Sequence, residues 1–487
     1  MSKKKYDVGI GNPDDFTERL GSLCFPKPER SNSLNGNSSG VPPDMLLRKD
    51  SDSGFFFGGL NQFGQGQYVG IPTGTEGNVV LIGGNGSGKS STIMQTTRTW
   101  GGTFVATDIK GELSQAYADA FEDGDVTTPY LVFDPLDEDS PSYDPFWLLR
   151  QGDEADLVGN LLQLVYTLIP DLRNDINRFW TETERGVLAA ALWHFFQLSV
   201  SFSDAILGVA GRPLSDLCKT LVCDEDQVVK TLLGQTAEMK SEVVANVDRG
   251  IRNAIMNIAA DSRIIDALRT PNGCRPRFTW ADLETHNIFL RIPADKVEVW
   301  GPVVNLMYAQ LITYLMRRPE KYSPEGRSMP HVLLLLDEFP RLGKLEAILP
   351  AVTTLRSKGV TLCPVIQSLA QLDAIYGRDE RRIILDNCQF KLVFGAGDPD
   401  TQAELSELVG KRTYLTHGIA EQYNRRGELT GYSRQISETR DWLIQPHEWA
   451  TIKDGVLSTP YGTVRVDKFD RNKTYENPKK RFLLGQQ

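Results

Sequence analysis

Residues 78–91 read NVVLIGGNGSGKSS, a short apolar run that leads directly into a glycine-rich segment and a lysine. Gly83–Ser90 fits the pattern GxxxxGK[ST]. Glycines at these positions let successive backbone N–H groups face one anion, and the first turn of a following helix adds to the attraction. The stretch therefore predicts a strand at Asn78–Ile82, a phosphate-binding loop, and a helix at Ser90–Thr99. A glycine-rich surface turn is the alternative.

The same loop predicts a site for ATP and Mg²⁺. In this motif the lysine, here Lys89, reaches the β- and γ-phosphates, and the hydroxyl of Ser90 binds the magnesium ion. We expect the nucleotide to be held by Gly83, Gly84, Asn85, Gly86, Ser87, Gly88, Lys89, Ser90 and Ser91.

A second segment, residues 331–338, reads HVLLLLDE and ends an apolar run on two carboxylates. Carboxylates at the end of a buried strand are costly unless they meet a cation and water. Together with the phosphate loop, the segment predicts that Asp337 holds the Mg²⁺ hydration shell and that Glu338 polarises the attacking water. Taken alone, it would fit a solvated strand end equally well.

The next apolar run, Thr361–Gln367, ends on an amide. We expect Gln367 to contact the γ-phosphate or the lytic water. Arg356 lies between the two runs and is a candidate arginine finger for the nucleotide of a neighbouring subunit. Each residue has a simpler alternative. Gln367 would then be a plain strand-end amide, and Arg356 a cation that satisfies the dipole at a helix C-terminus.

The apolar runs fall into two groups on either side of a long helical stretch. Runs of this length, uninterrupted by polar residues, fit a parallel sheet that is covered on both faces. The fold class predicted is α/β, with a mainly parallel sheet and an inserted all-α domain. The expected strands lie at 78–82, 103–107, 130–133, 287–292, 331–336, 361–366 and 390–394, and the expected helices of the insertion at 153–169, 179–198, 227–233 and 239–260.

This pattern divides the 487 residues into four parts. Residues 1–60 are expected to be a flexible tail, because SNSLNGNSSGVPP at 31–43 is polar and rich in glycine and proline. The nucleotide-binding domain is discontinuous, with parts at 61–149 and 281–464, and the all-α domain fills 150–280. Residues 465–487 form a basic tail, with seven basic and three acidic residues between Arg465 and Arg481.

Composition excludes several classes of protein. Hydrophobic residues make up 40% and charged residues 24% of the chain, which excludes global disorder. The 53 Lys and Arg residues against 63 Asp and Glu residues give a net charge of −10, so nucleic acid would need a local basic track. The six cysteines form no CxxC pair, and this predicts inert thiols in a reducing cytosol rather than a zinc site or disulfides.

The uncharged run Val299–Met316 has the length of a membrane span, but it contains glycine, proline, asparagine and glutamine. We therefore expect a buried helix there. The N-terminus, MSKKKYD, lacks the apolar core of a signal peptide, so the chain is expected to be soluble by itself.

Several longer blocks together resemble the type IV secretion coupling proteins, the VirD4/TraG family. They occur in the family's order between about Gly70 and Thr463 and are far more specific than the phosphate loop. The blocks are TDIKGE at 107–112, FDP at 133–135, YDP at 143–145, LDEFPRLG at 336–343, SKGV at 357–360, QSLAQL at 367–372, YG at 376–377 and FGA at 394–396.

The resemblance implies a RecA-like ATPase that assembles as a homohexamer at the cytoplasmic entrance of a secretion channel. Such proteins recruit single-stranded DNA with its relaxase, or protein effectors. By motif position, Lys89 and Ser90 take the nucleotide and magnesium roles, Asp337 and Glu338 the second carboxylate motif, Gln367 the sensor and Arg356 the trans-acting arginine. The helical stretch matches the substrate-facing domain. Asp108 and Lys110 match a family block for which we have no firm role.

Members of this family usually begin with two transmembrane helices, and none is expected here. We therefore expect the protein to be cytoplasmic and peripheral at the inner face of the membrane, held there by a membrane-anchor or channel partner. Whether it serves a secretion channel or a related mobilisation system stays open at this point.

Three functions compete on the sequence. The first is an ATP-driven translocase that feeds single-stranded DNA to a conjugation or mobilisation channel. The second is an ATP-regulated receptor that docks protein effectors without moving DNA. A chromosome-partitioning translocase fits less well, because the helical insertion and the family blocks count against it. Glu338 and Gln367 favour turnover but do not name the cargo.

The helical insertion carries a possible DNA contact. Six arginines lie between residues 249 and 277, and Arg249 and Arg252 share a helix face at a spacing of three. A solvated amphipathic helix is the alternative for this pair, and a solubilising tail is the alternative for the basic C-terminus.

Overall fold

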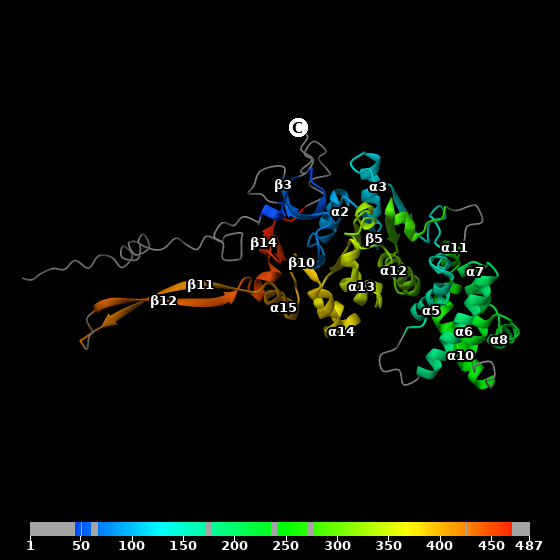
Figure 1. The fold of residues 1–487 in the computed structure, drawn as a ribbon. Coiled ribbons are helices and arrows are strands. Elements are labelled where there is room, and N and C mark those ends of the chain that lie inside the picture. The colour runs from blue at the N-terminus through cyan, green and yellow to red at the C-terminus, as the bar shows by residue number, and fades with distance from the viewer. Residues whose placement is uncertain are drawn as a thin grey trace, which may run out of the picture.

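The computed structural model describes residues 44–49, 51–59, 67–170, 178–234, 241–269, 276–423, 426–427 and 429–469. Figure 1 shows a central sheet with helices on both faces, a helical bundle at one end, and a long two-stranded arm at the other. Residues 1–43 of the predicted tail at 1–60, and residues 470–487 of the predicted tail at 465–487, lie outside the described residues.

A nine-stranded sheet forms the centre of the molecule. Its strand order is β14-β13-β10-β4-β9-β8-β5-β7-β6. The seven strands from β10 to β6 pair in parallel, and only β13 and β14 at one edge are antiparallel. The strands are β4 (Asn78–Ile82), β5 (Thr103–Asp108), β6 (Tyr130–Phe133), β7 (Asn287–Arg291), β8 (Val332–Leu336), β9 (Val360–Ile366), β10 (Cys388–Val393), β13 (Gly455–Thr459) and β14 (Gly462–Val466).

The central strands are buried on both faces, which explains their uninterrupted apolar sequences. Along β4, Val80 and Ile82 belong to one hydrophobic cluster, whereas Val79 and Leu81 belong to another. Successive side chains of a strand point to opposite faces, so each face of the sheet has a core of its own. The helices around these cores are α2 (Lys89–Thr99), α3 (Glu112–Glu122), α12 (Gly301–Met316), α13 (Ile348–Thr354), α14 (Leu369–Asp386) and α15 (Pro399–Val409).

The chain leaves the sheet after β6 and returns to it at β7. Apart from short 3₁₀ turns, the elements described between Phe146 and Ala267 are α-helices, grouped at one end of the molecule in Figure 1. Four short helices, α4, α7, α8 and α11, of four to nine residues each, are absent from the sequence prediction. The helices are α4 (Phe146–Leu149), α5 (Leu157–Leu168), α6 (Arg178–Gln197), α7 (Phe202–Ala210), α8 (Leu214–Val222), α9 (Gln227–Leu233), α10 (Ser241–Ala259) and α11 (Ser262–Ala267).

The prediction of a flexible tail up to residue 60 is wrong for its last part. Strands β1 (Leu47–Lys49), β2 (Gly54–Gly59) and β3 (Gln67–Pro72) form a small antiparallel sheet. Phe55, Phe56 and Phe57 of β2 are fully buried. The alternation that marks a half-exposed strand is missing here, because β2 is covered on both faces and its run of three phenylalanines has glycines on either side.

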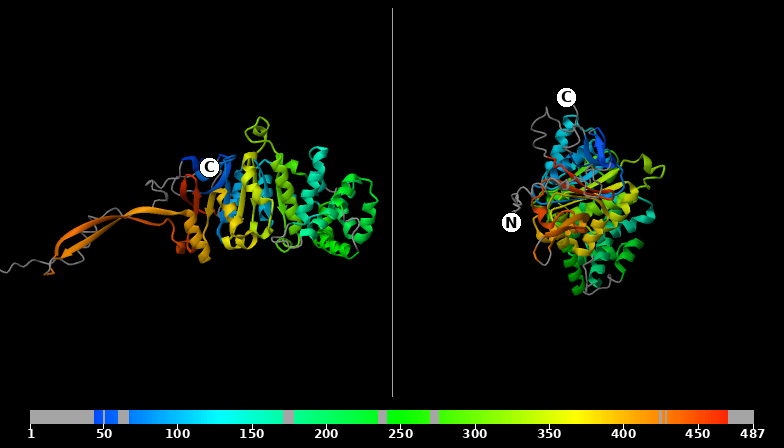
Figure 2. Two further views of the ribbon diagram at one scale, coloured as in Figure 1. Left: turned by 60° about the horizontal axis from the view of Figure 1, so that its bottom comes forward. Right: turned by 90° about the vertical axis from the view of Figure 1, so that its left-hand side faces the viewer.

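Strands β11 (Lys411–Tyr423) and β12 (Leu429–Trp442) form the arm, which is absent from the strands predicted by sequence. They pair only with each other, over thirteen backbone positions. At about 3.4 Å per residue the ribbon is roughly 40 Å long. Figures 1 and 2 both show it extending away from the body. Polar and apolar residues alternate irregularly along its sequence, so the sequence predicts no buried face for these strands.

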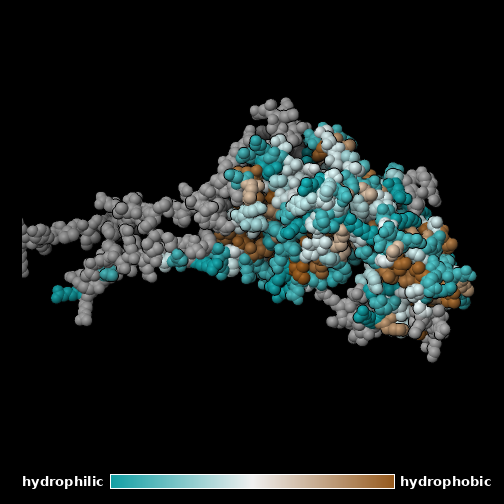
Figure 3. Space-filling view, in the orientation of Figure 1, coloured by the Kyte–Doolittle hydropathy of each residue, from teal (hydrophilic) through white to brown (hydrophobic). Residues whose placement is uncertain are grey.

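On the face that Figure 3 shows, the surface of the body is mainly hydrophilic. Figure 3 shows small apolar areas scattered over it, including some on the helical end. Exposed hydrophobic side chains in that part of the chain include Val222 and Met256.

Candidate functional site

The phosphate loop lies between β4 and α2, as the sequence predicts. Gly86 and Gly88 adopt left-handed backbone angles, with φ of 71° and 108°, which glycine tolerates at no steric cost. At Gly83 a β-carbon would approach the Ser87 Oγ to 2.7 Å, so a side chain there would obstruct the loop. The backbone is thus curled tightly enough to direct its N–H groups toward one anion.

A cleft of about 490 Å³ opens above the carboxyl ends of the parallel strands. In open α/β sheets this edge is where ligands bind. The cleft brings together residues from five separate parts of the sequence. Its lining comprises Asn85, Gly86, Ser87, Gly88, Lys89, Ser90, Ser91, Lys110, Glu112, Asp337, Glu338, Gln367, Lys468 and Phe469. Most of the predicted site residues are among them.

Lys89 is 9% exposed and points back over the loop. Its ammonium donates hydrogen bonds to the carbonyl oxygens of Gly83 and Gly84, the latter at 2.8 Å. Burial lowers the pKa of Lys89 to about 8, against the opposing effect of the Asp337 charge. A poorly hydrated ammonium held in this position gains strongly from an added anion such as phosphate.

Asp337 and Glu338 follow β8 and face the same cleft, but their surroundings differ. Burial, and then the charge of Glu338, raise the pKa of Asp337 to about 6. For Glu338 burial also raises the pKa, but hydrogen bonds from Arg341 and Lys110 outweigh it and the net shift is downward. The two neighbouring carboxyl groups are therefore tuned to different proton affinities.

Residues at the cleft fit a magnesium ion. The described residues contain no group of three acidic, histidine or cysteine side chains that would hold a metal alone. Mg²⁺ commonly takes one or two protein ligands and completes its shell with water and phosphate oxygens. Ser90 and the mostly buried Asp337 both line the cleft and supply that kind of donor set. The Ser87 hydroxyl beside them is buried without a hydrogen-bond partner.

Gln367 comes directly after β9 and lines the cleft opposite the phosphate loop. The two segments are joined at this point, because the backbone N–H of Gly83 donates to the carbonyl oxygen of Ile366, at 3.1 Å. The structure thus brings Gln367 into the same cleft as the phosphate loop, at the end of a strand that pairs with β4.

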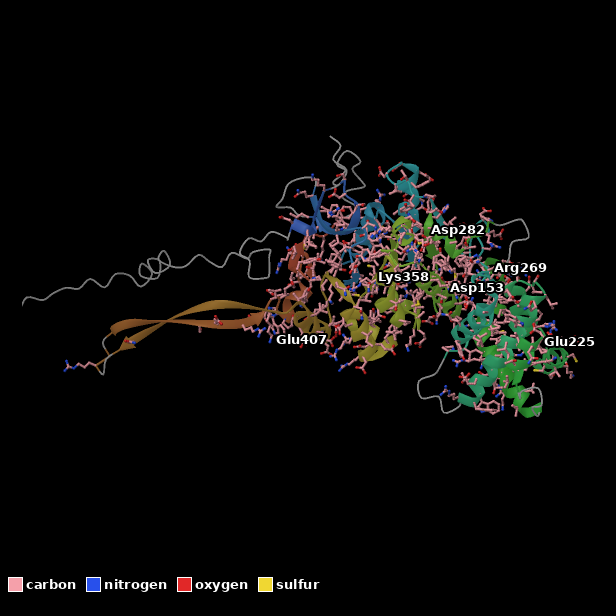
Figure 4. All side chains as sticks on the ribbon, in the orientation of Figure 1. Asp153, Glu225, Arg269, Asp282, Lys358 and Glu407 are labelled. Atoms are coloured by element: carbon pink, nitrogen blue, oxygen red, sulfur yellow. The ribbon has the colours of Figure 1, made fainter. Side chains whose placement is uncertain are left out.

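Arg356 lies at the opposite edge of the sheet. It belongs to the 3₁₀ turn η7 (Leu355–Lys358), which precedes β9, and Lys358 of the same turn is labelled in Figure 4. The seven residues of β9 separate this turn from Gln367 by roughly 20 Å. The Arg356 side chain is 52% exposed, and its Nε lies 3.9 Å from Oε2 of Glu76. Within one chain, therefore, Arg356 does not meet the cleft.

The block TDIKGE, which had no assigned role, lies beside the cleft. Asp108 ends β5 and is 2% exposed. It accepts hydrogen bonds from the backbone N–H and the hydroxyl of Ser114, at 2.7 Å and 2.6 Å. Asp108 thus fixes the start of α3, and the loop between carries Lys110 into the cleft, where its Nζ lies 3.2 Å from Oε1 of Glu338.

The last described residues, Lys468 and Phe469, also reach the cleft, although neither is among the predicted site residues. The predicted tail from 465 onward is wrong over Arg465–Phe469, since β14 continues to Val466. Lys468 donates to the carbonyl oxygen of Phe394 at 3.2 Å, and the Phe469 ring packs 5.5 Å from the ring of Phe56. Because this segment is rich in charged residues, its sequence does not predict the contacts that it makes with the body.

The two arginines proposed to contact DNA differ in their surroundings. Arg252 is engaged within the chain: its Nε bonds to Asp248 at 3.0 Å, and its other nitrogens donate to the carbonyl oxygens of Ala210 and Arg212. These bonds give Arg252 a structural role at the end of α7, and its contact with DNA stays a prediction. Arg249 is exposed on α10.

Other arginines of the helical end are also neutralised within the chain. Arg269, labelled in Figure 4, lies 3.1 Å from carboxylate oxygens of both Asp204 and Asp266. Arg263 is paired with Asp261 at 3.3 Å. The count of basic residues therefore overstates the free positive charge at this end.

Within the described ranges, no helix combines the length and apolarity needed to cross a membrane. The expected buried helix at 299–316 is α12, and residues such as Leu306 and Leu311 lie in the core.

Comparison with known proteins places these features in a family. The model of the family described as type IV secretory system conjugative DNA transfer matches residues 29–456. Protein VirD4 of Rhizobium radiobacter is 24% identical over 394 residues, or 79% of this chain and 55% of VirD4. The conjugal transfer protein TraG of Escherichia coli is 23% identical over 387 residues, or 74% of this chain and 60% of TraG. The chain spans little more than half the length of these relatives.

Solved structures show the same fold. The bacterial conjugative coupling protein TrwBdeltaN70, in a trigonal form with sulphate, matches with a TM-score of 0.63 at 16% identity, over 82% of this chain and 88% of TrwBdeltaN70. The plasmid coupling protein TrwB in complex with ADP and Mg²⁺ matches with a TM-score of 0.62 at 17% identity, over 82% and 87% of the two chains. The predicted RecA-like α/β fold with a mainly parallel sheet is thereby confirmed.

Proposed function

The chain belongs to the type IV secretory system conjugative DNA transfer family, and on that basis we propose that it is an ATP-hydrolysing coupling protein. It recruits relaxase-bound single-stranded DNA and drives the DNA toward the channel of a conjugation or mobilisation system. The observation that carries this proposal is the convergence of Lys89, Ser90, Asp337, Glu338 and Gln367 on one cleft at the carboxyl edge of the sheet.

Each of these side chains has a distinct task in the proposed reaction. Lys89 and the backbone N–H groups of the loop bind the phosphates of ATP. Ser90 and Asp337 would hold Mg²⁺, which neutralises charge on the β- and γ-phosphates when bound. Glu338 orients a water molecule and accepts its proton while the water oxygen attacks the γ-phosphorus. The bond from that phosphorus to the β,γ-bridging oxygen breaks, which leaves ADP and phosphate.

Two further residues link ATP hydrolysis to the rest of the protein and to a neighbouring subunit. Gln367, at the end of β9, contacts the γ-phosphate or the lytic water and reports hydrolysis to the sheet. Arg356 completes the site of a neighbouring subunit in a homohexamer. Its exposure at the far edge of the sheet supports an action in trans. An arginine finger of this kind stabilises transition-state charge that the subunit holding the nucleotide leaves uncompensated.

The partners follow from the same proposal. They are single-stranded DNA with its relaxase, and a channel or membrane-anchor protein that holds the complex at the inner face of the cell membrane. The relatives named conjugal transfer and coupling proteins support a DNA cargo over protein effectors. The helical end, grouped away from the arm in Figure 1, is the part that we propose faces this cargo.

Single-turnover and steady-state ATPase assays of the full chain test the proposal. We expect hydrolysis that requires Mg²⁺ and rises on addition of single-stranded DNA. Stimulation by an effector protein alone, with no response to DNA, would favour the receptor function instead. Wild-type turnover in Lys89→Ala would remove the cleft from the reaction altogether.

A further inference from the structure

Lys110 occupies a position that the proposed reaction leaves unexplained. Its Nζ lies 3.2 Å from Oε1 of Glu338, and the second oxygen of that carboxylate accepts a hydrogen bond from Arg341 at 2.9 Å. Glu338 itself is only 7% exposed. Both oxygens of the group expected to accept a proton from water are therefore engaged by cations in this structure.

The loop that carries Lys110 is fixed at both ends. At its start, the carboxylate of Asp108 accepts hydrogen bonds from the backbone N–H and the hydroxyl of Ser114. Gly111, just after the lysine, has a φ of 71°, and a β-carbon there would lie 2.6 Å from Nη2 of Arg291. Arg291 is in turn paired with Asp134 at 3.5 Å. The backbone position of Lys110 is therefore set by the fold and not by its contact with Glu338.

The Lys110 side chain, in contrast, is half exposed, at 51%. A long side chain on a fixed backbone can swing its ammonium by several ångströms at little cost, because water already surrounds part of it. The cleft contains two other lysines: Lys89, whose ammonium is bound to the phosphate loop, and Lys468, whose ammonium donates to the carbonyl oxygens of Phe394 and Ile452. Lys110 is thus the lysine of the cleft that is able to move between partners.

The positive charge of Lys110 acts on the whole site. It stabilises the ionised form of both Asp337 and Glu338, and it opposes the charged form of Lys89. Lys110 lines the same cleft as the phosphate loop and both carboxylates, so its ammonium is within the site proposed for the triphosphate. A γ-phosphate carries more negative charge than a single carboxylate and competes well for such an ammonium.

We propose that Lys110 is a positioning residue that distinguishes a nucleoside triphosphate from a diphosphate. In the resting site it holds Glu338 together with Arg341. A bound γ-phosphate draws the ammonium to itself, which frees Oε1 of Glu338 to accept the proton of the attacking water. Release of that phosphate after hydrolysis returns Lys110 to Glu338. This inference rests on the proposed ATPase function and adds a nucleotide sensor to it.

Binding measurements on the full chain test the sensor directly. We would measure the affinities of ADP and of a non-hydrolysable ATP analogue, with Mg²⁺, for wild type, Lys110→Met and Lys110→Arg. Loss of a hydrogen bond between charged groups costs roughly 10- to 100-fold in affinity. We expect Lys110→Met to lose this factor for the triphosphate and to keep its ADP affinity within about twofold. Lys110→Arg should recover most of the difference. Lys219→Met, on the exposed surface of α8, is the matched control.

Several results would overturn the proposal. Equal losses for both nucleotides would make Lys110 a general phosphate ligand or a structural residue, and unchanged affinities would leave it without a role. If Lys110→Met melts below wild type, Lys110→Gln serves in its place, since it keeps the polarity of the side chain without the charge. Failure of the wild-type chain to bind either nucleotide would contradict the proposed function itself, so the two failures are distinguishable.

Discussion

Asp337 and Glu338 are adjacent in the chain and face one cleft, yet their pKa values are shifted in opposite directions. Burial and the charge of its neighbour raise the pKa of Asp337 to about 6, whereas hydrogen bonds from Arg341 and Lys110 bring the net pKa shift of Glu338 below its usual value. The two neighbouring carboxyl groups thus suit different tasks: Asp337 is prepared to receive a cation, and Glu338 to remain ionised.

The raised pKa of Asp337 predicts that this residue destabilises the chain at neutral pH. The native state keeps the Asp337 proton up to about pH 6 and the unfolded state loses it near pH 4, so stability falls as the pH rises through that interval. Asp337→Asn should therefore be more stable than wild type at pH 7.5, by roughly 1–3 kcal/mol. Thermal melting between pH 4 and 7.5, without nucleotide or Mg²⁺, measures this gap, which should close toward pH 4. A stability difference that does not change with pH would show that ionisation of Asp337 is not its cause.

Lys89→Ala and Glu338→Gln are expected to fail at different steps. The first removes the cation that faces the phosphates, so nucleotide binding should be lost and hydrolysis should fall by roughly 10²–10³-fold or more. The second keeps the shape of the carboxylate but cannot accept a proton, so turnover should fall by about 10²–10⁴-fold with ATP still bound. Equilibrium binding alongside single-turnover kinetics separates the two. If Glu338→Gln binds ATP as poorly as Lys89→Ala does, Glu338 is structural or a metal ligand.

Arg356→Ala should reduce ATPase activity by roughly 10³–10⁵-fold with little change in nucleotide affinity, because the finger acts on a neighbour's transition state. Mixing supplies the decisive measurement. Arg356→Ala subunits keep a sound phosphate loop and Lys89→Ala subunits keep a sound arginine, so a mixed ring should regain part of the activity. No recovery, despite demonstrated co-assembly, would leave Arg356 as a surface cation.

Glu76 supplies the matched control for that experiment. Its carboxylate accepts hydrogen bonds from Tyr322, at 2.6 Å, and from Lys321, at 2.9 Å, and these contacts lower its pKa to about 2. Arg356 lies at the edge of the same group. If Arg356 only completes this surface network, Glu76→Gln should impair the ATPase as much as Arg356→Ala does. If Arg356 acts in trans, Glu76→Gln should remain close to wild type.

Arg249 and Arg252 are expected to separate DNA binding from stability. Arg252→Ala leaves the carbonyl oxygens at the end of α7 without their donors, and it should destabilise the helical end by about 1–3 kcal/mol. Arg249→Ala should leave melting unchanged. If α10 follows a DNA backbone, the Arg249 variant should also bind single-stranded DNA more weakly and with a salt slope reduced by about one. Titrations at several salt concentrations test this, and identical curves for wild type and Arg249→Ala would move the DNA contact elsewhere.

The parts of the site that could be predicted from sequence are those encoded by neighbouring residues. The phosphate loop, Asp337, Glu338 and Gln367 each come at the end of an apolar run, and parallel strands bring such ends to one edge. Lys110 and Lys468 reach the cleft through loops whose course no local pattern encodes. Arg252 shows the converse. Its spacing from Arg249 can be read from the sequence, whereas the carbonyl oxygens of Ala210 and Arg212 that it binds lie about forty residues away and cannot.

The fold could likewise be predicted where a local sequence pattern encodes an element, and could not be predicted elsewhere. Strands that are buried on both faces can be recognised in the sequence as uninterrupted apolar runs, as β8 can. The short strand β2 does not, because glycines flank its three phenylalanines and a polar segment precedes it. The arm could not be predicted, because polar and apolar residues follow no regular period along the sequences of its two strands, which pair with each other in a separate sheet.

The strand order also constrains how the protein is made. β5 lies between β7 and β8, so a strand that ends at residue 108 has no neighbour in the sheet until residues 287–336 have been synthesised. At ribosomal rates of about 5–20 residues per second, those residues appear roughly 10–50 s later. Through that interval the apolar strands β4 and β5 protrude from the ribosome without partners, while the helices after them are already able to fold. The nascent chain is therefore a natural client for chaperones, and a pause in translation beyond residue 336 would help it more than one before.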